Sequence, residues 1–176
     1  MATNDVNLGI GRAAGMFFTA TAGTALPGNL TSLASWGTEV GYVSHDGITL
    51  HLAQNKETLK DWSNSIRRML PSTDSGTVQV PVISTTADSL AAVFGTANVT
   101  GTTVTINPNN VQDAKAWCLV MVDGDDYIIL GTTNGYVSDI DDVTMEPEGA
   151  ITWNTTISAD TWSLVKGTAS STTTTT

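Results

Sequence analysis

The chain has 176 residues, 40% of them hydrophobic and only 14% charged, so it carries enough apolar side chains for one folded core and lacks the composition of a disordered protein. Its formal net charge of −10 argues against conventional nucleic-acid binding, yet it suits a protein that lets a polyanion pass without sticking. The single cysteine, Cys118, excludes an internal disulfide, no apolar stretch is long enough to span a membrane, and the start shows no signal-peptide pattern. We therefore expect synthesis in a cytoplasm, and the frequent Thr and Gly indicate a β-rich fold.

In the first half of the chain, alternation of apolar and polar residues predicts short strands. One is expected at residues 16–20, before the loop-like sequence GTALPGN at 23–29. Two more flank the dipeptide Asp46-Gly47, where we expect a tight turn that reverses the chain or bulges a strand. The sequence GTVQVPVIS at 76–84 alternates valines with polar residues and predicts a further strand.

Residues 57–70 have an ambiguous pattern. Their apolar side chains fall at helical spacing, and Pro71 could end a helix. However, Trp62, Ile66 and Leu70 would also share one face of a strand. Periodicity alone slightly favours the helix.

The clearest helix is TTADSLAAVFG at residues 85–95. Thr86 or Asp88 can cap its N-terminus, and Gly95 can terminate it. Its apolar residues form a stripe on one side: Leu90, Val93 and Phe94.

The second half of the chain predicts an antiparallel meander of strands. The near-continuous apolar run KAWCLVMV at 115–122 is typical of a strand covered on both faces. Asp123-Gly124 and Asn134-Gly135 are hairpin signals. The remaining strands are expected at residues 102–107, 149–157 and 160–167.

The whole is expected to form a single domain at residues 1–168. The Thr-rich end, residues 169–176, has low complexity and is expected to be disordered.

Two patterns raise the question of catalysis, and each has a plainer interpretation. Neighbours on a strand point to opposite faces, so His45 and Asp46 lack the geometry of a base with its orienting carboxylate. Gly9, Gly11 and Ala14 match the spacing of a dinucleotide motif but lack the strand that must precede it. We therefore expect no catalytic residue and no cofactor.

Six aspartates lie at two expected turns and offer the hard oxygen ligands that Ca²⁺ prefers. Their spacing does not match an EF-hand, and aspartate is favoured in turns for its own hydrogen bonds, so we expect solvated turns and no metal site. The six are Asp123, Asp125, Asp126, Asp139, Asp141 and Asp142.

Charge is unevenly placed along the chain. From Asp113 to Asp160 there are ten acidic residues and a single basic one, Lys115. Four of the seven basic residues fall within a short segment: Lys56, Lys60, Arg67 and Arg68. Ordinary surface variation is one interpretation. The other is head-to-tail self-association, because opposite patches on one chain can meet between identical subunits.

Five segments follow one another in the first half of the sequence: GTALP (23–27), GYVSHDGI (41–48), KDWSNSIRRM (60–69), GTVQVPVIS (76–84) and DSLAAVFG (88–95). In this order they resemble the major tail proteins, or tail tube proteins, of long-tailed, non-contractile bacteriophages. The resemblance covers residues 10 to 100, and the rest of the chain agrees by size and β content.

The resemblance implies a mainly β subunit, an antiparallel β-sandwich or partial barrel with one short flanking helix. Such subunits assemble into stacked, usually hexameric rings with a continuous β-barrel around the lumen. It also implies a strand within residues 60–69 in place of the helix, and a ring-to-ring loop around residues 52–60.

By the same resemblance, the chain is a structural protein of the virion tail and no enzyme. Its partners are further copies of itself and the tape measure, tail tip and tail terminator proteins, while DNA passes through the lumen without specific binding. We expect some of the six aspartates to line the lumen and repel phosphates, and the four basic residues at 56–68 to contact acidic residues of a neighbouring subunit or ring.

The alternative is a β-sandwich carbohydrate-binding module or adhesin. Exposed tryptophans could stack on sugars, and the candidates are Trp36, Trp62, Trp117, Trp153 and Trp162. A hydrolase is poorly supported, and another virion part of related fold, such as a tail terminator or a head decoration protein, stays open.

Overall fold

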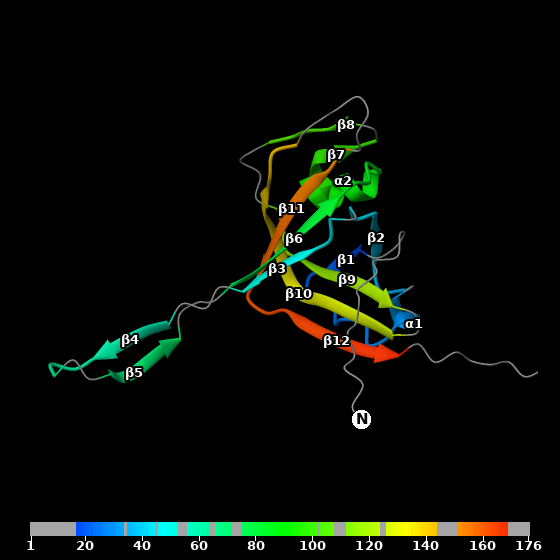
Figure 1. Cartoon of the computed structure of the whole chain (residues 1–176). Helices are drawn as coiled ribbons and strands as arrows, with labels where there is room; N and C mark the ends of the chain where they lie inside the picture. The colour runs from blue at the N-terminus through cyan, green and yellow to red at the C-terminus, as the bar shows by residue number, and fades with distance from the viewer. Residues whose placement is uncertain are drawn as a thin grey trace, which may run out of the picture.

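The computed structural model describes residues 17–33, 35–44, 46–52, 56–63, 66–71, 75–101, 103–107, 112–123, 126–143 and 151–168, with 56–59, 66–71 and 123 described by their backbone. The fold is mainly antiparallel β (Figure 1). The elements are β1 (Phe17–Thr21), α1 (Leu30–Leu33), β2 (Thr38–Gly41), β3 (Thr49–Leu52), β4 (Lys56–Lys60), β5 (Ile66–Pro71), β6 (Gly76–Val82), α2 (Ala87–Phe94), the 3₁₀ turn η1 (Thr96–Asn98), β7 (Val99–Thr100), β8 (Thr103–Val104), β9 (Lys115–Asp123), β10 (Asp126–Ile140), β11 (Trp153–Ala159) and β12 (Ser163–Thr168).

The main sheet has the strand order β2-β1-β9-β10-β11-β6-β3, with β12 also paired to β10. Gly135 of β10 pairs with Ala159, and Gly131 pairs with Ser163. Hence β11 and β12 follow one another along the same edge of β10, on either side of residues 160–162. Only β9, β10 and β11 form the expected meander, because β6 comes from earlier in the chain and lies beside β11.

The sheet curls until its two ends meet, which makes it a partial barrel. β2 pairs with β1 as far as Gly41. The following residues leave β1 and pair with the end of β6, where Ser44 N donates to Pro81 O at 2.8 Å and Ile83 N donates to Tyr42 O at 3.0 Å. Gly41 has a φ of 125°, which lies in the region that favours glycine, so it is the residue at which the chain turns this corner.

The dipeptide Asp46-Gly47 forms a bulge, one of the two outcomes expected for it. Five residues lie between Val43 and Thr49, whereas only two lie between their partners Val82 and Gln79 on β6. The extra residues form a tight turn in which Gly47 N donates to the carbonyl of Ser44 at 3.2 Å. The chain therefore keeps its direction along β6 and does not reverse.

β9 is buried on both faces, as its apolar run predicted. Trp117 and Leu119 belong to one hydrophobic core, with β6, β11 and α2. Cys118 and Val120 face the other core, with Leu33 of α1. The alternation of side chains along this one strand thus connects the two cores through the sheet.

The helix predicted at 85–95 is confirmed as α2. The Thr86 side chain accepts a hydrogen bond from Ser89 N, and Gly95 ends the helix. Val93 and Phe94 are buried in the first core, and Leu90 packs partly against it. A second, four-residue helix, α1, follows the loop at 23–29 and begins with Asn29, whose side chain accepts from Ser32 N at 2.8 Å.

The hairpin predicted at Asn134-Gly135 is wrong. β10 continues through this dipeptide, and Gly135 pairs with both Lys115 of β9 and Ala159 of β11. The irregularity between Thr132 and Gly135 is a bulge. The hairpin signal at Asp123-Gly124 is different, because β9 and β10 do pair there from Asp123 and Asp126 onward.

The helix that periodicity favoured within residues 57–70 is also wrong. β4 and β5 pair as an antiparallel hairpin from Lys56–Pro71 to Lys60–Ile66. The strand that the family resemblance implied at 60–69 is confirmed from Ile66 onward, whereas Trp62 lies in a turn between β4 and β5. In Figure 1 this hairpin projects from the body at the lower left, and its strands make their main contacts with each other.

Several expectations fall outside the described residues. They concern the dinucleotide-like glycines at 9–14, His45, and the C-terminal residues 169–176. Within the described part of the chain, no helix is long and apolar enough to cross a membrane.

Candidate functional site: a projecting hairpin, open strand edges and a pocket

The structure gathers all four clustered basic residues on the projecting hairpin. Lys56 and Lys60 are the first and last residues of β4, and Arg67 and Arg68 lie on β5. Lys60 is exposed. Since the rest of the chain is strongly acidic, this hairpin is a basic arm on an acidic body.

The root of the hairpin is held by Trp162. Its indole Nε1 donates to the carbonyl of Gly76, the first residue of β6, at 3.0 Å. A Cβ on Gly76 would meet Trp162 Cδ1 at 2.6 Å and Leu52 Cδ2 at 3.1 Å, so the three residues are tightly packed. Leu52 and Gly76 are the residues at which the chain leaves and re-enters the sheet. The hairpin therefore emerges from a fixed base.

The tip of the hairpin exposes Trp62. The carboxylate of Asp61 accepts hydrogen bonds from Ser63 N at 3.0 Å and from Ser63 Oγ at 2.6 Å, which closes the turn around Trp62. The relative exposure of Trp62 is 106%, so the whole side chain is presented to solvent. An indole held in this way on a narrow arm is the kind of residue that anchors protein interfaces.

Of the main-sheet strands that pair with a single described strand, β3 and β12 are the two that expose large apolar side chains. β3 pairs with β6 on one side, and β12 pairs with β10 on one side, with no described strand on the other side of either. All four side chains of β3 are exposed, including Leu50 and Leu52, and Leu164 of β12 is 62% exposed. Open edges with apolar side chains are templates for pairing with another chain.

The six aspartates that the sequence grouped fall into two places. Asp123 and Asp126 lie where β9 meets β10, and Asp125 lies outside the described residues. Asp139 lies thirteen residues further along β10, which corresponds to about 40 Å of strand. Asp141 and Asp142 follow the end of that strand, and these last three side chains are exposed.

The two groups are held by different contacts. Asp126 accepts a hydrogen bond from Thr168 Oγ1 at 3.0 Å, and Asp141 accepts one from Gln79 Nε2 at 2.5 Å. Among the described residues, no three His, Cys, Asp or Glu side chains come together as a metal site. The aspartates thus form two acidic regions at opposite ends of β10, and which of them faces a lumen stays a prediction.

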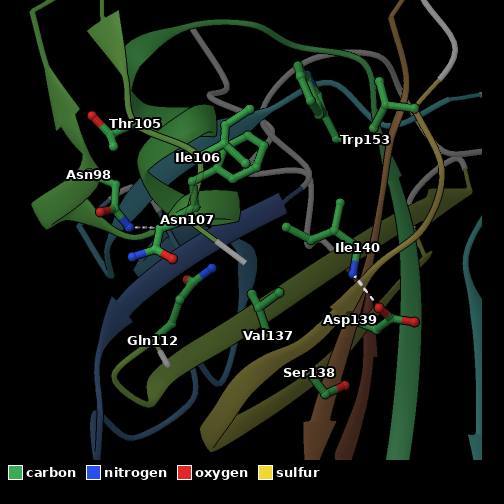
Figure 2. A pocket seen from close by; sticks show the side chains of 12 residues that line it. Asn98, Thr105, Ile106, Asn107, Gln112, Val137, Ser138, Asp139, Ile140 and Trp153 are labelled. Atoms are coloured by element: carbon green, nitrogen blue, oxygen red, sulfur yellow. Dashed lines mark hydrogen bonds between the residues drawn. The ribbon is translucent and has the colours of Figure 1, made fainter. Parts of the chain in front are cut away.

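A pocket of about 440 Å³ lies beside the second acidic region. Figure 2 shows side chains from α2, η1, the segment after β8, β10 and β11 converging on it. Most of the surface that lines the pocket is apolar. Asp139 of β10 is the charged lining residue, and Ile106 is a lining residue that is 62% exposed. The lining residues are Phe94, Asn98, Thr105, Ile106, Asn107, Gln112, Val137, Ser138, Asp139, Ile140, Val143 and Trp153.

Two polar atoms among these pocket-lining residues are buried without a hydrogen-bond partner. They are the indole Nε1 of Trp153, a donor, and Oε1 of Gln112, an acceptor. Trp153 is only 7% exposed, and its ring packs edge-on against Phe94 with centroids 5.3 Å apart. The amide nitrogen of Gln112 donates to the carbonyl of Val93, which leaves the oxygen for another group. Sequence reasoning missed this pocket and singled out Trp153 only as a possible sugar-stacking residue.

The five tryptophans do not form one sugar-binding surface. Trp117 is buried and donates to the carbonyl of Gly135 at 3.0 Å, and Trp36 and Trp162 are half-buried with their indole nitrogens bonded to carbonyls. Trp62 is alone at the hairpin tip. The arrangement therefore gives no specific support to a carbohydrate-binding module.

Of the residues first considered for catalysis, the structure describes only Asp46, which accepts a hydrogen bond from Ser44 Oγ at 2.8 Å within the bulge turn; His45 lies outside the described residues. Cys118 is fully buried, and burial raises the pKa of its thiol to about 12, so it is a poor nucleophile. Burial also lowers the pKa of Lys115, although Asp113 opposes the shift, and Lys115 Nζ donates to the carbonyl of Ala91 at 3.2 Å.

Comparison with known proteins gives one family. The sequence profile of the phage tail tube protein family matches residues 1–162. A search of curated proteins finds no match.

Proposed function

The chain belongs to the phage tail tube protein family, and on this premise we propose that its copies assemble into stacked rings, hexameric as the resemblance implies, which form the tube of a long, non-contractile tail. DNA passes through the lumen of that tube to the host. The subunit is a structural component of the virion tail. The tail tip, tape measure and tail terminator proteins are its proposed further partners.

The observation that carries this proposal is the pair of open edges, β3 and β12. The two edges belong to different strands. On each strand, the backbone N–H and C=O groups of one edge pair with no described residue. Pairing of β12 on one copy with β3 on the next is a heterologous contact, which closes into a ring when the rotation between copies allows it. Each added contact also covers apolar side chains such as Leu52 and Leu164, which are 60% and 62% exposed.

The charge distribution supports passage of DNA through such a ring. Lumen-facing carboxylates repel phosphates and keep the polyanion from sticking. The two acidic regions at the ends of β10 are the proposed source of that charge, and the basic hairpin is proposed to contact acidic residues of a neighbouring subunit or ring. A density map of the tube that places both acidic regions on the outer wall contradicts the first of these assignments.

Electron microscopy of the purified protein at high concentration, with light scattering alongside, tests the assembly. We expect hollow tubes or stacked rings. A chain that stays monomeric even when supplied with its tail tip complex overturns the proposal, and binding to a glycan array would favour the adhesin alternative.

Edge variants test the proposed contact itself. Thr49→Lys on β3 and Leu164→Lys on β12 place a charge on an open edge, which opposes strand pairing. Both side chains are exposed, so the monomer should keep its circular dichroism and melting temperature while tubes are lost. The control is Asn154→Lys, on a strand whose two edges are paired with β10 and β6. Tubes that form normally from both edge variants contradict the assigned edges.

A further inference from the structure

The hairpin tip and the pocket lie toward opposite ends of the same strands. The hairpin leaves the body at Gly76, where β6 begins, and the pocket is lined by Trp153, whose partner Val82 is the last residue of β6. Seven residues of β6 separate the two places, about 20 Å of strand. In Figure 1 the hairpin points away from the region of α2, β7 and β8 that borders the pocket. The tip of a chain therefore extends away from its own pocket (Figure 1).

The tip and the pocket are complementary in shape and in polarity. The tip presents one fully exposed indole, and the pocket has about 440 Å³ of mostly apolar space, the small end of the range for binding pockets. Gln112 and Trp153 both line the pocket, but their unpartnered atoms, Oε1 and Nε1, are buried beneath its surface, so the match between tip and pocket rests on apolar contact.

The charges around the two features are opposite in sign. The hairpin carries four basic residues (Lys56, Lys60, Arg67 and Arg68) and two acidic ones (Glu57 and Asp61), so its net charge is 4 − 2 = +2. The mouth of the pocket has the exposed Asp139, and Asp141 and Asp142 follow it in sequence. Opposite charges around an apolar anchor favour docking in one orientation and speed the encounter.

We propose that Trp62 of one copy docks into the pocket of a second copy, with its indole ring filling the apolar space beside Phe94, Val137 and Ile140. The contact is heterologous, because one copy contributes the tip and the other the pocket, and it propagates along a stack of subunits. It rests on the proposed self-assembly, and it names the anchor and the receptor site that the basic hairpin uses.

The first test compares full-length variants in tube formation. Trp62→Ala removes an exposed side chain, so the monomer should fold normally, while the concentration needed for tube formation should rise roughly tenfold or more. Trp62→Phe keeps a smaller ring and should have an intermediate effect. If Trp62→Ala polymerises like the wild type, the proposal is wrong.

The second test locates the contact without requiring tubes. A chain with Ser63→Cys, next to the anchor, is mixed with a chain carrying Ile106→Cys at the rim of the pocket. The native Cys118 is fully buried and should not interfere. Under oxidising conditions a disulfide between the two chains is expected. Adding Trp62→Ala to the first chain should abolish it, and a Leu164→Cys partner should not cross-link.

The outcomes separate the two proposals. The docking is overturned, and the tube proposal is kept, if the wild type forms tubes, no cross-link appears and Trp62→Ala has no effect. The pocket is then filled by another segment of the same chain or by a small molecule. Cross-linking in solution with no tubes under any condition supports the docking and overturns the tube. Cross-linking that survives Trp62→Ala overturns the role of the indole.

Discussion

Trp117→Phe should destabilise the subunit strongly, because the indole has two roles in the first core. Its ring stacks on Phe17 with centroids 5.4 Å apart, and its Nε1 donates to the buried carbonyl of Gly135 at 3.0 Å. Losing the donor removes this buried hydrogen bond, which costs about 0.5–1.5 kcal/mol. The smaller ring leaves a space that costs roughly 1–2 kcal/mol more. The expected loss in the free energy of unfolding is therefore about 1.5–3.5 kcal/mol.

The assay is urea unfolding followed by far-ultraviolet circular dichroism, at protein concentrations below those at which subunits associate. The midpoint should fall while the slope stays the same. Trp36→Phe is the matched control, since its indole also donates to a carbonyl, Ala25 O at 2.6 Å, but the residue is half-buried and water can replace the bond. It should cost less than about 1 kcal/mol. Equal losses at Trp117 and Trp36 would refute the argument from burial.

The same substitution at Trp153 gives a second comparison. Trp153 is nearly as buried as Trp117, yet its Nε1 has no partner in the isolated subunit. Trp153→Phe removes an unsatisfied donor, which offsets part of the lost packing against Phe94. Its cost in the unassembled chain should be clearly smaller than that of Trp117→Phe. A larger cost would mean that the nitrogen already has a partner in the free subunit.

Two further predictions concern the corner of the sheet and the single thiol. Gly41→Ala should cost more than about 2 kcal/mol of unfolding free energy, because φ is 125° and the new Cβ would lie 2.6 Å from Ser84 Cβ. Gly47→Ala, at a φ of 84° with open space around it, should cost only about 1 kcal/mol. The melting temperatures of the two variants provide the check, and equal shifts contradict the steric argument. Cys118 should resist alkylation at pH 8 in the folded chain, since a thiol pKa of about 12 leaves roughly one thiolate in 10⁴. It should react fully in denaturant. Labelling is measured by mass spectrometry, and rapid labelling of the folded chain would show that the core opens.

The sequence identified the elements whose signals are local and strong. α2 combines a capping threonine, an apolar stripe and a terminal glycine within one short segment. β9 has an apolar run that only a strand between two cores can bury. In both cases the residues that determine the structure lie next to one another in the chain, so neighbouring residues were enough.

The errors arose where distant contacts outweigh local preference. Asn134-Gly135 has the strongest short-range hairpin signal, but the strand continues because β9 and β11 both pair with it there, and a Cβ on Gly135 would meet Trp117 Cδ1 at 3.1 Å. In residues 57–70 the helical spacing did not produce a helix, because the backbone of β4 pairs with that of β5 as a hairpin. Periodicity predicts a helix only when one face is buried against something.

The candidate sites could be predicted only in part for a similar reason. The four basic residues lie within thirteen positions of one another in the sequence, so their presence on one hairpin could be expected. The pocket brings together residues between Phe94 and Trp153 from several elements, and its unpartnered atoms depend on packing. The open edges depend on strand order, which the sequence did not reveal because β6 lies beside β11.

The way the hairpin is rooted decides how the subunit would respond to mechanical load. The hairpin of β4 and β5 lies between β3 and β6 in the sequence, and β6 is paired over all seven residues with β11. Tension on the arm along the strand direction must shear these hydrogen bonds together, whereas a pull across the sheet would break them one at a time. The anchor of Trp162 on Gly76 lies at the point where the load enters. A bending tail would therefore transmit force from subunit to subunit through the sheet in its strongest direction.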